Sequence, residues 1–225
     1  MAGFKVHFLA AAITGGCLGT AMLQSGMLEP HGVLAAFFLT SFGGVVPDLD
    51  ADHSIVLATA TTVMAVVVSF LAMFHWRQGQ GVVELIALWF GCYLFFKWVV
   101  LGFVTRLTVH RGIVHSIPAA ILGGIMTVLF LHDLLGWPDH LSWLGGGFFW
   151  TGYMVHLTVD ELTGLKVFRL GGFGPSLLGR ALKFRGPGIL STVAVYLAIF
   201  LAIPFLPELA ALGPAVTRLS AGPFH

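Results

Sequence analysis

A short polar segment, residues 110–116 with the sequence HRGIVHS, separates two long apolar stretches of the chain. Polar positions also border apolar stretches at His7, at residues 48–53 (DLDADH), and at His156 with Asp160. Imidazole nitrogens and carboxylate oxygens together are typical ligands of zinc and other divalent metals. Ionisable groups beside apolar stretches are costly in a membrane and usually mark a functional site. These positions therefore predict metal chemistry, provided that the fold brings them together.

The composition is that of an integral membrane protein. Of the 225 residues, 57% are hydrophobic and only 9% are charged, and the mean hydropathy is +0.94. A soluble domain carries about 25% charged residues. The net charge of +1 says nothing about partners, and the sequence has no basic face of the kind that binds nucleic acid. We therefore expect a membrane protein whose partners are lipids or lipid-linked molecules rather than nucleic acids.

The apolar stretches predict an all-α fold. A helix needs about 20 apolar residues to cross the hydrocarbon core, and breakers such as Pro47 and Trp137-Pro138-Asp139 separate stretches of that size. We predict a polytopic transmembrane bundle of about seven helices, which forms a single domain over residues 1–206. The helices are expected at residues 7–24, 31–47, 54–74, 82–104, 117–135, 141–160 and 189–206.

Two segments fall outside this helical pattern. Residues 161–188 form a long basic loop, in which residues 177–185 show the spacing of a short amphipathic helix lying in the membrane interface. Residues 207–225 contain three prolines and are expected to be a loosely ordered C-terminal tail.

The alternation of the helices determines which loops share a side of the membrane. The N-terminus and the segments 48–53, 105–116 and 161–188 fall on one side, which carries most of the Lys and Arg residues and is therefore cytoplasmic. The same side receives all the candidate ligands: His7, Asp48, Asp50, His110, His115, His156 and Asp160. Nothing in the charge count required this grouping, and it predicts one site. His31, His75, His132 and His140 fall on or near the other side, and we assign them no role.

Each part of the candidate site also has a simpler explanation. His156 and Asp160 are four residues apart, so they share a helix face, but such pairs often only hydrogen-bond each other. Asp48 and Asp50 can converge on a cation, or can belong to a solvated interfacial loop. His7 alone would be an ordinary interfacial histidine.

The segment 110–116 has comparable alternatives. His110 and His115 are five residues apart and would diverge on a regular helix, so a turn at Gly112 is expected. The guanidinium of Arg111 suits a phosphate or carboxylate group, or serves only as a topology signal. Ser116 is expected to cap the next helix. Lys97 is expected to extend toward the cytoplasmic interface, or to steady an anionic substrate.

The order of these elements resembles the LexA-regulated, membrane-bound metal-dependent hydrolase family of bacteria and archaea. The residues that carry the resemblance are His7, Pro47-Asp48-Leu49-Asp50, the segment 110–116, and His156 with Asp160, within roughly residues 1–165. It implies an inner-membrane protein with metal ligands at the matching His and Asp positions, and hydrolysis of a substrate such as a phosphoester. The basic loop and the seventh helix lie outside the resemblance.

The resulting hypothesis is a metal-dependent hydrolase at the cytoplasmic membrane face that acts on a phosphoester or lipid-like substrate. It would hold one or two divalent ions, with zinc as the first choice. Asp50 and His110 would serve as bases or ligands, and Arg111 would hold an anionic group. Two alternatives stay open: a transporter or proton-conducting protein that uses the same residues, and a structural membrane protein whose polar clusters only set its topology.

Overall fold

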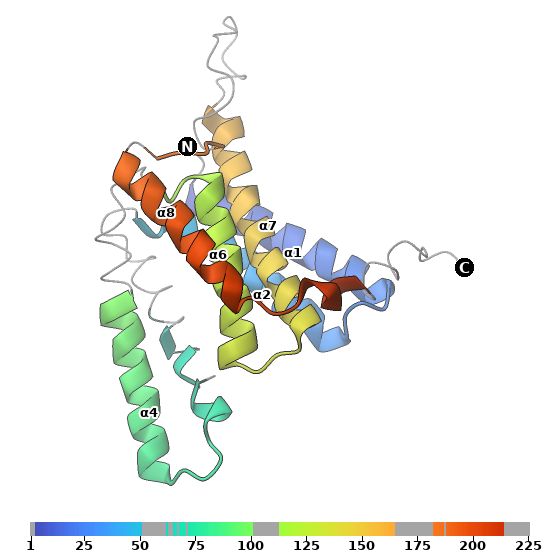
Figure 1. Ribbon diagram of the computed structural model, residues 1–225. Coiled ribbons are helices and arrows are strands. Elements are labelled where there is room, and N and C mark those ends of the chain that lie inside the picture. Colours follow the sequence, from blue (N-terminus) through green and yellow to red (C-terminus); the bar gives the residue numbers. More distant parts are fainter. Residues whose placement is uncertain are drawn as a thin grey trace, which may run out of the picture.

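The structure is a computed structural model and describes residues 3–50, 62, 65–66, 68–70, 72–100, 113–164, 182–186 and 188–213. Within these residues every regular element is a helix, which confirms the all-α prediction. The elements are α1 (Phe4–Gln24), α2 (Pro30–Gly43), the 3₁₀ turn η1 (Val46–Asp50), α4 (Val82–Leu94), the π-helical turn η2 (Phe95–Val100), α6 (Ile117–Leu129), the π-helical turn η3 (Phe130–Leu134), α7 (Asp139–Gly164), α8 (Ile189–Ala202), and the 3₁₀ turns η4 (Ile203–Phe205) and η5 (Leu209–Leu212) (Figure 1).

All seven predicted helices have helical counterparts in the described part of the chain, although only portions of the stretch 54–74 are described. By length and composition, three of the helical stretches can cross a membrane: Phe4–Gln24, Pro30–Asp48 and Ile117–Leu134. Large apolar side chains remain exposed on the outer helices, including Val83 on α4 and Leu190 on α8, which are 78% and 81% exposed. Such surfaces are stable against lipid rather than water.

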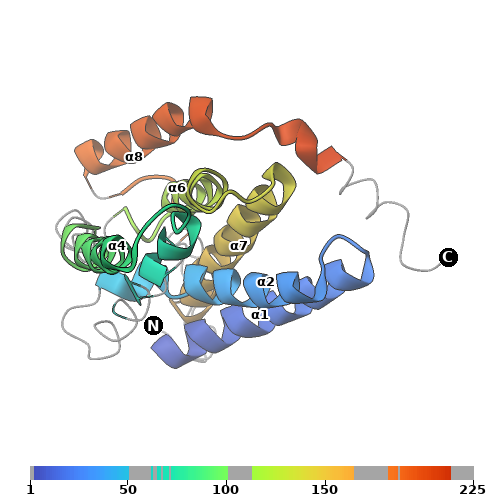
Figure 2. The same ribbon diagram turned by 90° about the horizontal axis from the view of Figure 1, so that it is seen from below.

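The helices form layers around α7. Figure 2 shows α6 and α7 between the α1–α2 pair on one side and α8 on the other. The helix contacts agree, because α7 packs against α1, α2 and α6, while α8 packs against α6. Glycines allow the backbones of α2 and α7 to touch: a Cβ atom on Gly152 would lie 1.8 Å from the carbonyl oxygen of Thr40. Small residues at helix interfaces are the usual basis of close packing in membranes.

Two local boundaries differ from expectation. Helix α2 ends at Gly43, and Pro47 lies in η1 rather than at the end of the helix. Helix α7 continues to Gly164, four residues past the predicted end at Asp160. This extra turn leaves Asp160 inside a regular helix, where its position relative to His156 is fixed.

The segment expected to be an interfacial helix also differs. Residues 182–186 are not helical, and residues 177–181 lie outside the described part of the chain. The main chain of this segment instead bonds to the start of α6, where Ile117 N–H donates to the carbonyl oxygen of Lys183 at 3.0 Å. Pro187 follows directly, and a proline disfavours helical geometry in the residue before it.

The start of the predicted tail contacts the bundle. The 3₁₀ turn η5 packs against α7, and the indole N–H of Trp143 donates to the carbonyl oxygen of Pro207 at 3.2 Å.

Candidate metal-binding site

Five polar side chains meet at the end of the bundle that carries the start of α1 and the last turns of α7. His7 comes from α1, Asp48 from η1, and His115 from the turn before α6. His156 and Asp160 come from α7, one turn apart. The structure thus brings together residues from four separate parts of the chain, all of them among the residues singled out in the sequence.

Asp160 lies at the centre of this cluster. Its Oδ1 atom is 3.3 Å from Nε2 of His7. Its Oδ2 atom is 3.6 Å from Nε2 of His156 and 3.9 Å from Nε2 of His115. Three imidazole rings therefore direct a nitrogen toward one carboxylate, which is an arrangement expected of ligand atoms around a common cation.

A backbone hydrogen bond determines which nitrogen of His156 faces the cluster. Its Nδ1 atom lies 2.8 Å from the carbonyl oxygen of Gly44. A carbonyl oxygen can only accept, so Nδ1 must carry the hydrogen. In the neutral ring Nε2 then presents a lone pair, which faces Oδ1 of Asp48 at 3.7 Å as well as Asp160. Electron pairs on all three residues point at one another, which is unfavourable without a positive charge between them.

Burial makes this arrangement more costly. His7 and His156 are 0% exposed, and Asp160 is 8% exposed. Both ring nitrogens of His7, Nε2 of His156 and Oδ1 of Asp160 are buried without a hydrogen-bond partner. A buried polar group left without a partner costs about 1–3 kcal/mol. A bound cation would satisfy several of these atoms at once.

The ligand atoms fall into two overlapping groups, each within 4.8 Å: His7, His156 and Asp160, and Asp48, His115 and His156. Either group can hold a metal ion. They share His156, whose Nδ1 atom is already bonded to Gly44, so only its Nε2 atom is available. A single nitrogen lone pair binds one ion. The two groups therefore describe one ion position with up to five ligands, as far as the described residues extend.

The turn that presents His115 is supported from both sides. The hydroxyl of Tyr153, on α7, donates to the carbonyl oxygen of Val114 at 2.6 Å. Ser116 caps α6 as expected from the sequence: its Oγ atom accepts from the backbone N–H of Ala119 at 3.4 Å and donates to the carbonyl oxygen of Ile113. These bonds fix the backbone on both sides of the histidine.

One residue beside the site was not singled out from the sequence. Glu161 is only 4% exposed, and its Oε2 atom accepts from the backbone N–H of Leu182 at 3.4 Å. It thereby ties residues 182–186 to α7. Burial in this segment lowers the pKa of the Lys183 ammonium. The signal in the sequence was the adjacent acid pair Asp160-Glu161 at the end of an apolar helix.

Several predicted site residues cannot be placed. His110 and Arg111 lie outside the described residues, as do Asp52 and His53. Asp50 belongs to η1, next to Asp48 in the turn, but only its backbone is described. Their proposed roles stay predictions from the sequence.

The sequence predicts that Lys97 extends toward the cytoplasmic end of its helix, and the structure shows a different orientation. Its Nζ atom donates to the hydroxyl of Tyr93, four residues earlier, at 2.8 Å. The ammonium group also lies 5.2 Å from the centre of the Tyr93 ring. The lysine is therefore turned back along α4, away from the end that it would need to reach for snorkelling.

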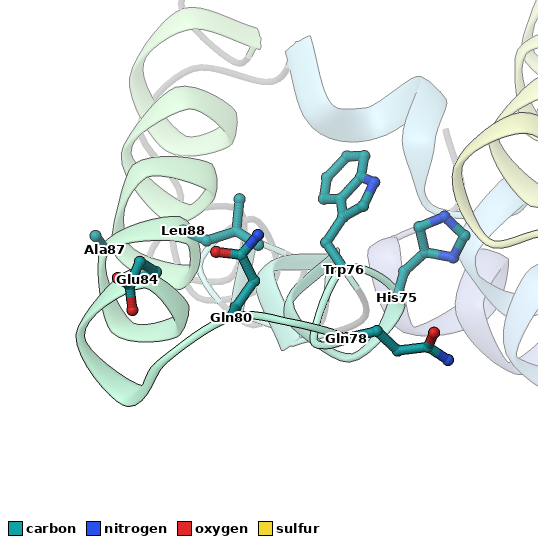
Figure 3. Close-up of a pocket in the computed structure, with 7 residues that line it drawn as sticks. All are labelled: His75, Trp76, Gln78, Gln80, Glu84, Ala87 and Leu88. Carbon is teal, nitrogen blue, oxygen red and sulfur yellow. The ribbon is translucent and has the colours of Figure 1, made fainter.

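A cavity of about 740 Å³ lies elsewhere, between residues 75–80 and the start of α4 (Figure 3). Its lining is His75, Trp76, Gln78, Gln80, Glu84, Ala87 and Leu88. None of the five clustered residues belongs to that lining. The turn that borders the cavity precedes α4 and lies at the end of the bundle opposite to the start of α1 and the last turns of α7. This cavity is thus unrelated to the candidate metal site.

Comparison with known protein families identifies a match over most of the chain. The family model described as "YdjM inner membrane protein" matches residues 1–205 of the chain. This range contains all five clustered residues and every predicted transmembrane helix except the last residue of the seventh. No curated protein and no solved structure matches. The chain therefore belongs to the YdjM inner membrane protein family, and it is a helical protein of the inner membrane.

Proposed function

We propose that this protein is a membrane-bound, metal-dependent hydrolase that holds one divalent ion between α1, η1, α7 and the turn before α6. The observation that carries the proposal is the environment of His156. Its Nδ1 atom is committed to the Gly44 carbonyl, so its Nε2 lone pair faces two carboxylates in a buried site. A divalent cation relieves this repulsion and satisfies the buried nitrogens and oxygens around it.

The donor set supports a metal such as zinc. Three imidazoles and two carboxylates form a nitrogen and oxygen set, which suits zinc and its neighbours among the divalent transition metals. His7, His156 and Asp160 are all buried and would hold the ion. Asp48 and His115 would complete its coordination. A second ion would need ligands from outside the described residues, such as His110.

A bound metal of this kind supplies an acidified water molecule and polarises a phosphoryl or acyl oxygen. The chain itself supplies the access. Among the clustered side chains, that of Asp48 is the most exposed, at 19%, whereas those of His7 and His156 are fully enclosed. Substrate would therefore approach from the Asp48 side, where Asp50, His110 and Arg111 also belong according to the sequence. We assign base roles to Asp50 and His110, and the binding of an anionic group to Arg111.

The substrate class follows from the position of the site. The cluster lies at one end of apolar helices that can cross a membrane, and in this proposal that end lies where headgroups meet water. A phosphoester on a lipid or lipid-linked molecule can reach this depth from within the membrane. We place this end of the bundle in the cytoplasm because the basic segments 105–116 and 161–188 fall on the same side of the membrane according to the sequence.

Metal content is the most direct test. The protein is purified in detergent, equilibrated with Zn²⁺, desalted and subjected to elemental analysis. We expect about one ion per chain for the wild type, none for Asp160→Asn, and one for the matched control His132→Gln at the other end of the bundle. Equal metal content in the wild type and Asp160→Asn would contradict the proposal and favour a structural or proton-conducting role.

The reaction class needs a separate assay. Release of inorganic phosphate from p-nitrophenyl phosphate and from vesicles containing phosphatidic acid is measured before and after metal removal. We expect hydrolysis that is lost with the ion and restored by Zn²⁺. Full activity of metal-free protein would contradict the metal-dependent mechanism.

The orientation is tested with cysteines. In a background where Cys17 and Cys92 are replaced by serine, Arg185→Cys and Gln78→Cys place one thiol near each end of the bundle. In intact spheroplasts an impermeant maleimide is expected to label Gln78→Cys and not Arg185→Cys. The reverse pattern would place the site outside the cytoplasm.

A further inference from the structure

We infer that Gly44 is a positioning residue: by lying without a side chain between α1 and α7, it sets both the tautomer of His156 and the separation of His156 from His7. The inference builds on the metal site of the proposed function, but it concerns the geometry of the metal-free protein. Gly44 itself would touch neither metal nor substrate.

Gly44 is a glycine because of space, not because of its backbone conformation. Its φ and ψ angles are −71° and −15°, which any residue adopts. A Cβ atom at this position, however, would lie 2.3 Å from the Cβ atom of Ala11 on α1. Real Cβ atoms cannot approach so closely, so a side chain here would force α1 or the Gly44 backbone to move.

The neighbours of Gly44 stand one helical turn from the two most buried histidines. Ala11 is four residues after His7 on α1, and Gly152 is four residues before His156 on α7. Gly152 packs directly against Gly44, because a Cβ on Gly152 would lie 3.0 Å from the Gly44 backbone nitrogen. Residues four apart on a helix lie above one another. Gly44 thus lies between the two helices one turn away from the two imidazoles. The ring centres of these imidazoles are 3.9 Å apart, and the angle between the ring planes is 22°.

The carbonyl of the same residue accepts from Nδ1 of His156 at 2.8 Å. Gly44 N–H is itself held by the carbonyl oxygen of Thr40 at 3.0 Å, so the peptide is anchored to α2. Any shift of this backbone away from Ala11 would displace the Gly44 carbonyl and disturb the geometry of its bond to His156. The imidazole would then lose the contact that keeps its hydrogen on Nδ1 and its lone pair on Nε2.

The test compares Gly44→Ala with its rescue by Ala11→Gly. The added methyl group should weaken Zn²⁺ binding about 10–100-fold, the range seen when the outer partner of a metal ligand is lost. Ala11→Gly removes the atom that the new methyl group meets, so the double variant should regain most of the affinity. Affinity is measured by competition with a Zn²⁺-binding dye. The double variant also serves as the folded test protein if Gly44→Ala alone does not fold.

A second measurement does not depend on metal. With ¹⁵N-labelled histidine, NMR of the metal-free protein should show His156 with its hydrogen on Nδ1 in the wild type. Gly44→Ala should show a mixture of tautomers, and the double variant should return to the wild-type pattern. A role limited to helix packing would change stability and leave the tautomer unaltered.

Gly19→Ala is the matched control. It adds a methyl group to the same α1–α2 contact, 3.0 Å from the Cβ atom of Ala36, but about 18 Å along α1 from His7. We expect it to lower thermal stability while Zn²⁺ affinity and the His156 tautomer stay unchanged.

The inference is overturned if Gly44→Ala keeps wild-type Zn²⁺ affinity and the Nδ1–H tautomer, or if Ala11→Gly restores neither. A wild-type protein that binds no metal would refute the proposed function but not this inference, because the NMR measurement would still report whether Gly44 sets the tautomer.

Discussion

The described part of the chain holds two groups of histidine and aspartate, at opposite ends of α6 and α7, and they are built very differently. At one end His7, His115 and His156 surround Asp160. At the other end His132 lies between two carboxylates, with Nδ1 at 2.7 Å from Asp133 and Nε2 at 3.2 Å from Asp139. The residue types are the same in both groups, so residue type alone does not define the candidate site.

Convergence and burial distinguish the two groups. The two nitrogens of His132 each point to a different carboxylate, on opposite sides of the ring, so no common position for an ion exists between them. The side chains of this group are also open to solvent, with exposed fractions of 33% for His132 and 58% for Asp133. In the other group, nitrogens from three rings point to one carboxylate, and both nitrogens of His7 and Nε2 of His156 are buried without a hydrogen-bond partner. We therefore propose a bound cation for the buried group and not for the exposed one.

The largest expected contrast is between matched amide substitutions in the two groups. Asp160→Asn removes the central negative charge without changing side-chain volume, and it should abolish retention of Zn²⁺ through desalting. Asp139→Asn makes the same chemical change in the exposed group and should leave metal content at the wild-type level. Elemental analysis of both purified variants measures this. If the two substitutions have the same effect, the distinction between the groups is mistaken.

Metal removal should affect stability through the buried group alone. A ligand present at 1,000 times its Kd stabilises the folded state by about 4 kcal/mol. The wild type should therefore melt at a lower temperature after chelation, followed by tryptophan fluorescence in detergent. His156→Gln should melt at the same temperature with and without chelator. An undiminished response to chelator in His156→Gln would place the stabilising ion elsewhere.

A smaller effect is expected from the turn that holds His115. Tyr153→Phe removes one of the two hydrogen bonds to the Val114 carbonyl and leaves only the bond from the Ser116 N–H, which should lower the free energy of unfolding by about 1 kcal/mol. The freer turn should also weaken Zn²⁺ binding several-fold.

Tyr196→Phe is the matched control for this change. It removes a comparable bond, from the hydroxyl of Tyr196 on α8 to the Phe184 carbonyl at 2.9 Å, and Tyr196 is 46% exposed. Zn²⁺ affinity should not change in this variant. Equal losses of affinity in the two tyrosine variants would show that the His115 turn has no special part in the site.

Much of this organisation could be predicted from the sequence, because it depends on run length and spacing. The apolar stretches gave the helices, since a membrane imposes a minimum length on them. The four-residue spacing placed His156 and Asp160 on one face. The alternation of helices placed His7 and Asp48 at the same end, although they lie far from α7 along the chain.

The remaining features depend on contacts that spacing does not encode. The tautomer of His156 follows from the Gly44 carbonyl, which reaches it only because Gly152 and Gly44 let the backbones of α2 and α7 touch. The spacing of residues 177–185 predicted a helix, but spacing does not reveal the competing hydrogen bond from Ile117 N–H, at the start of α6, to the carbonyl oxygen of Lys183. Glu161 was overlooked because its partner is a backbone amide of a loop rather than another charged side chain.

The smallest effect is expected at His132. Its substitution by glutamine breaks two ion pairs, but both are open to solvent, where water replaces them and salt screens them. Zn²⁺ content, Zn²⁺ affinity and melting temperature of His132→Gln should all match the wild type. A loss of bound metal in this variant would contradict the comparison. It would show that the exposed contacts of His132 contribute to metal binding, although they are neither buried nor directed at one point.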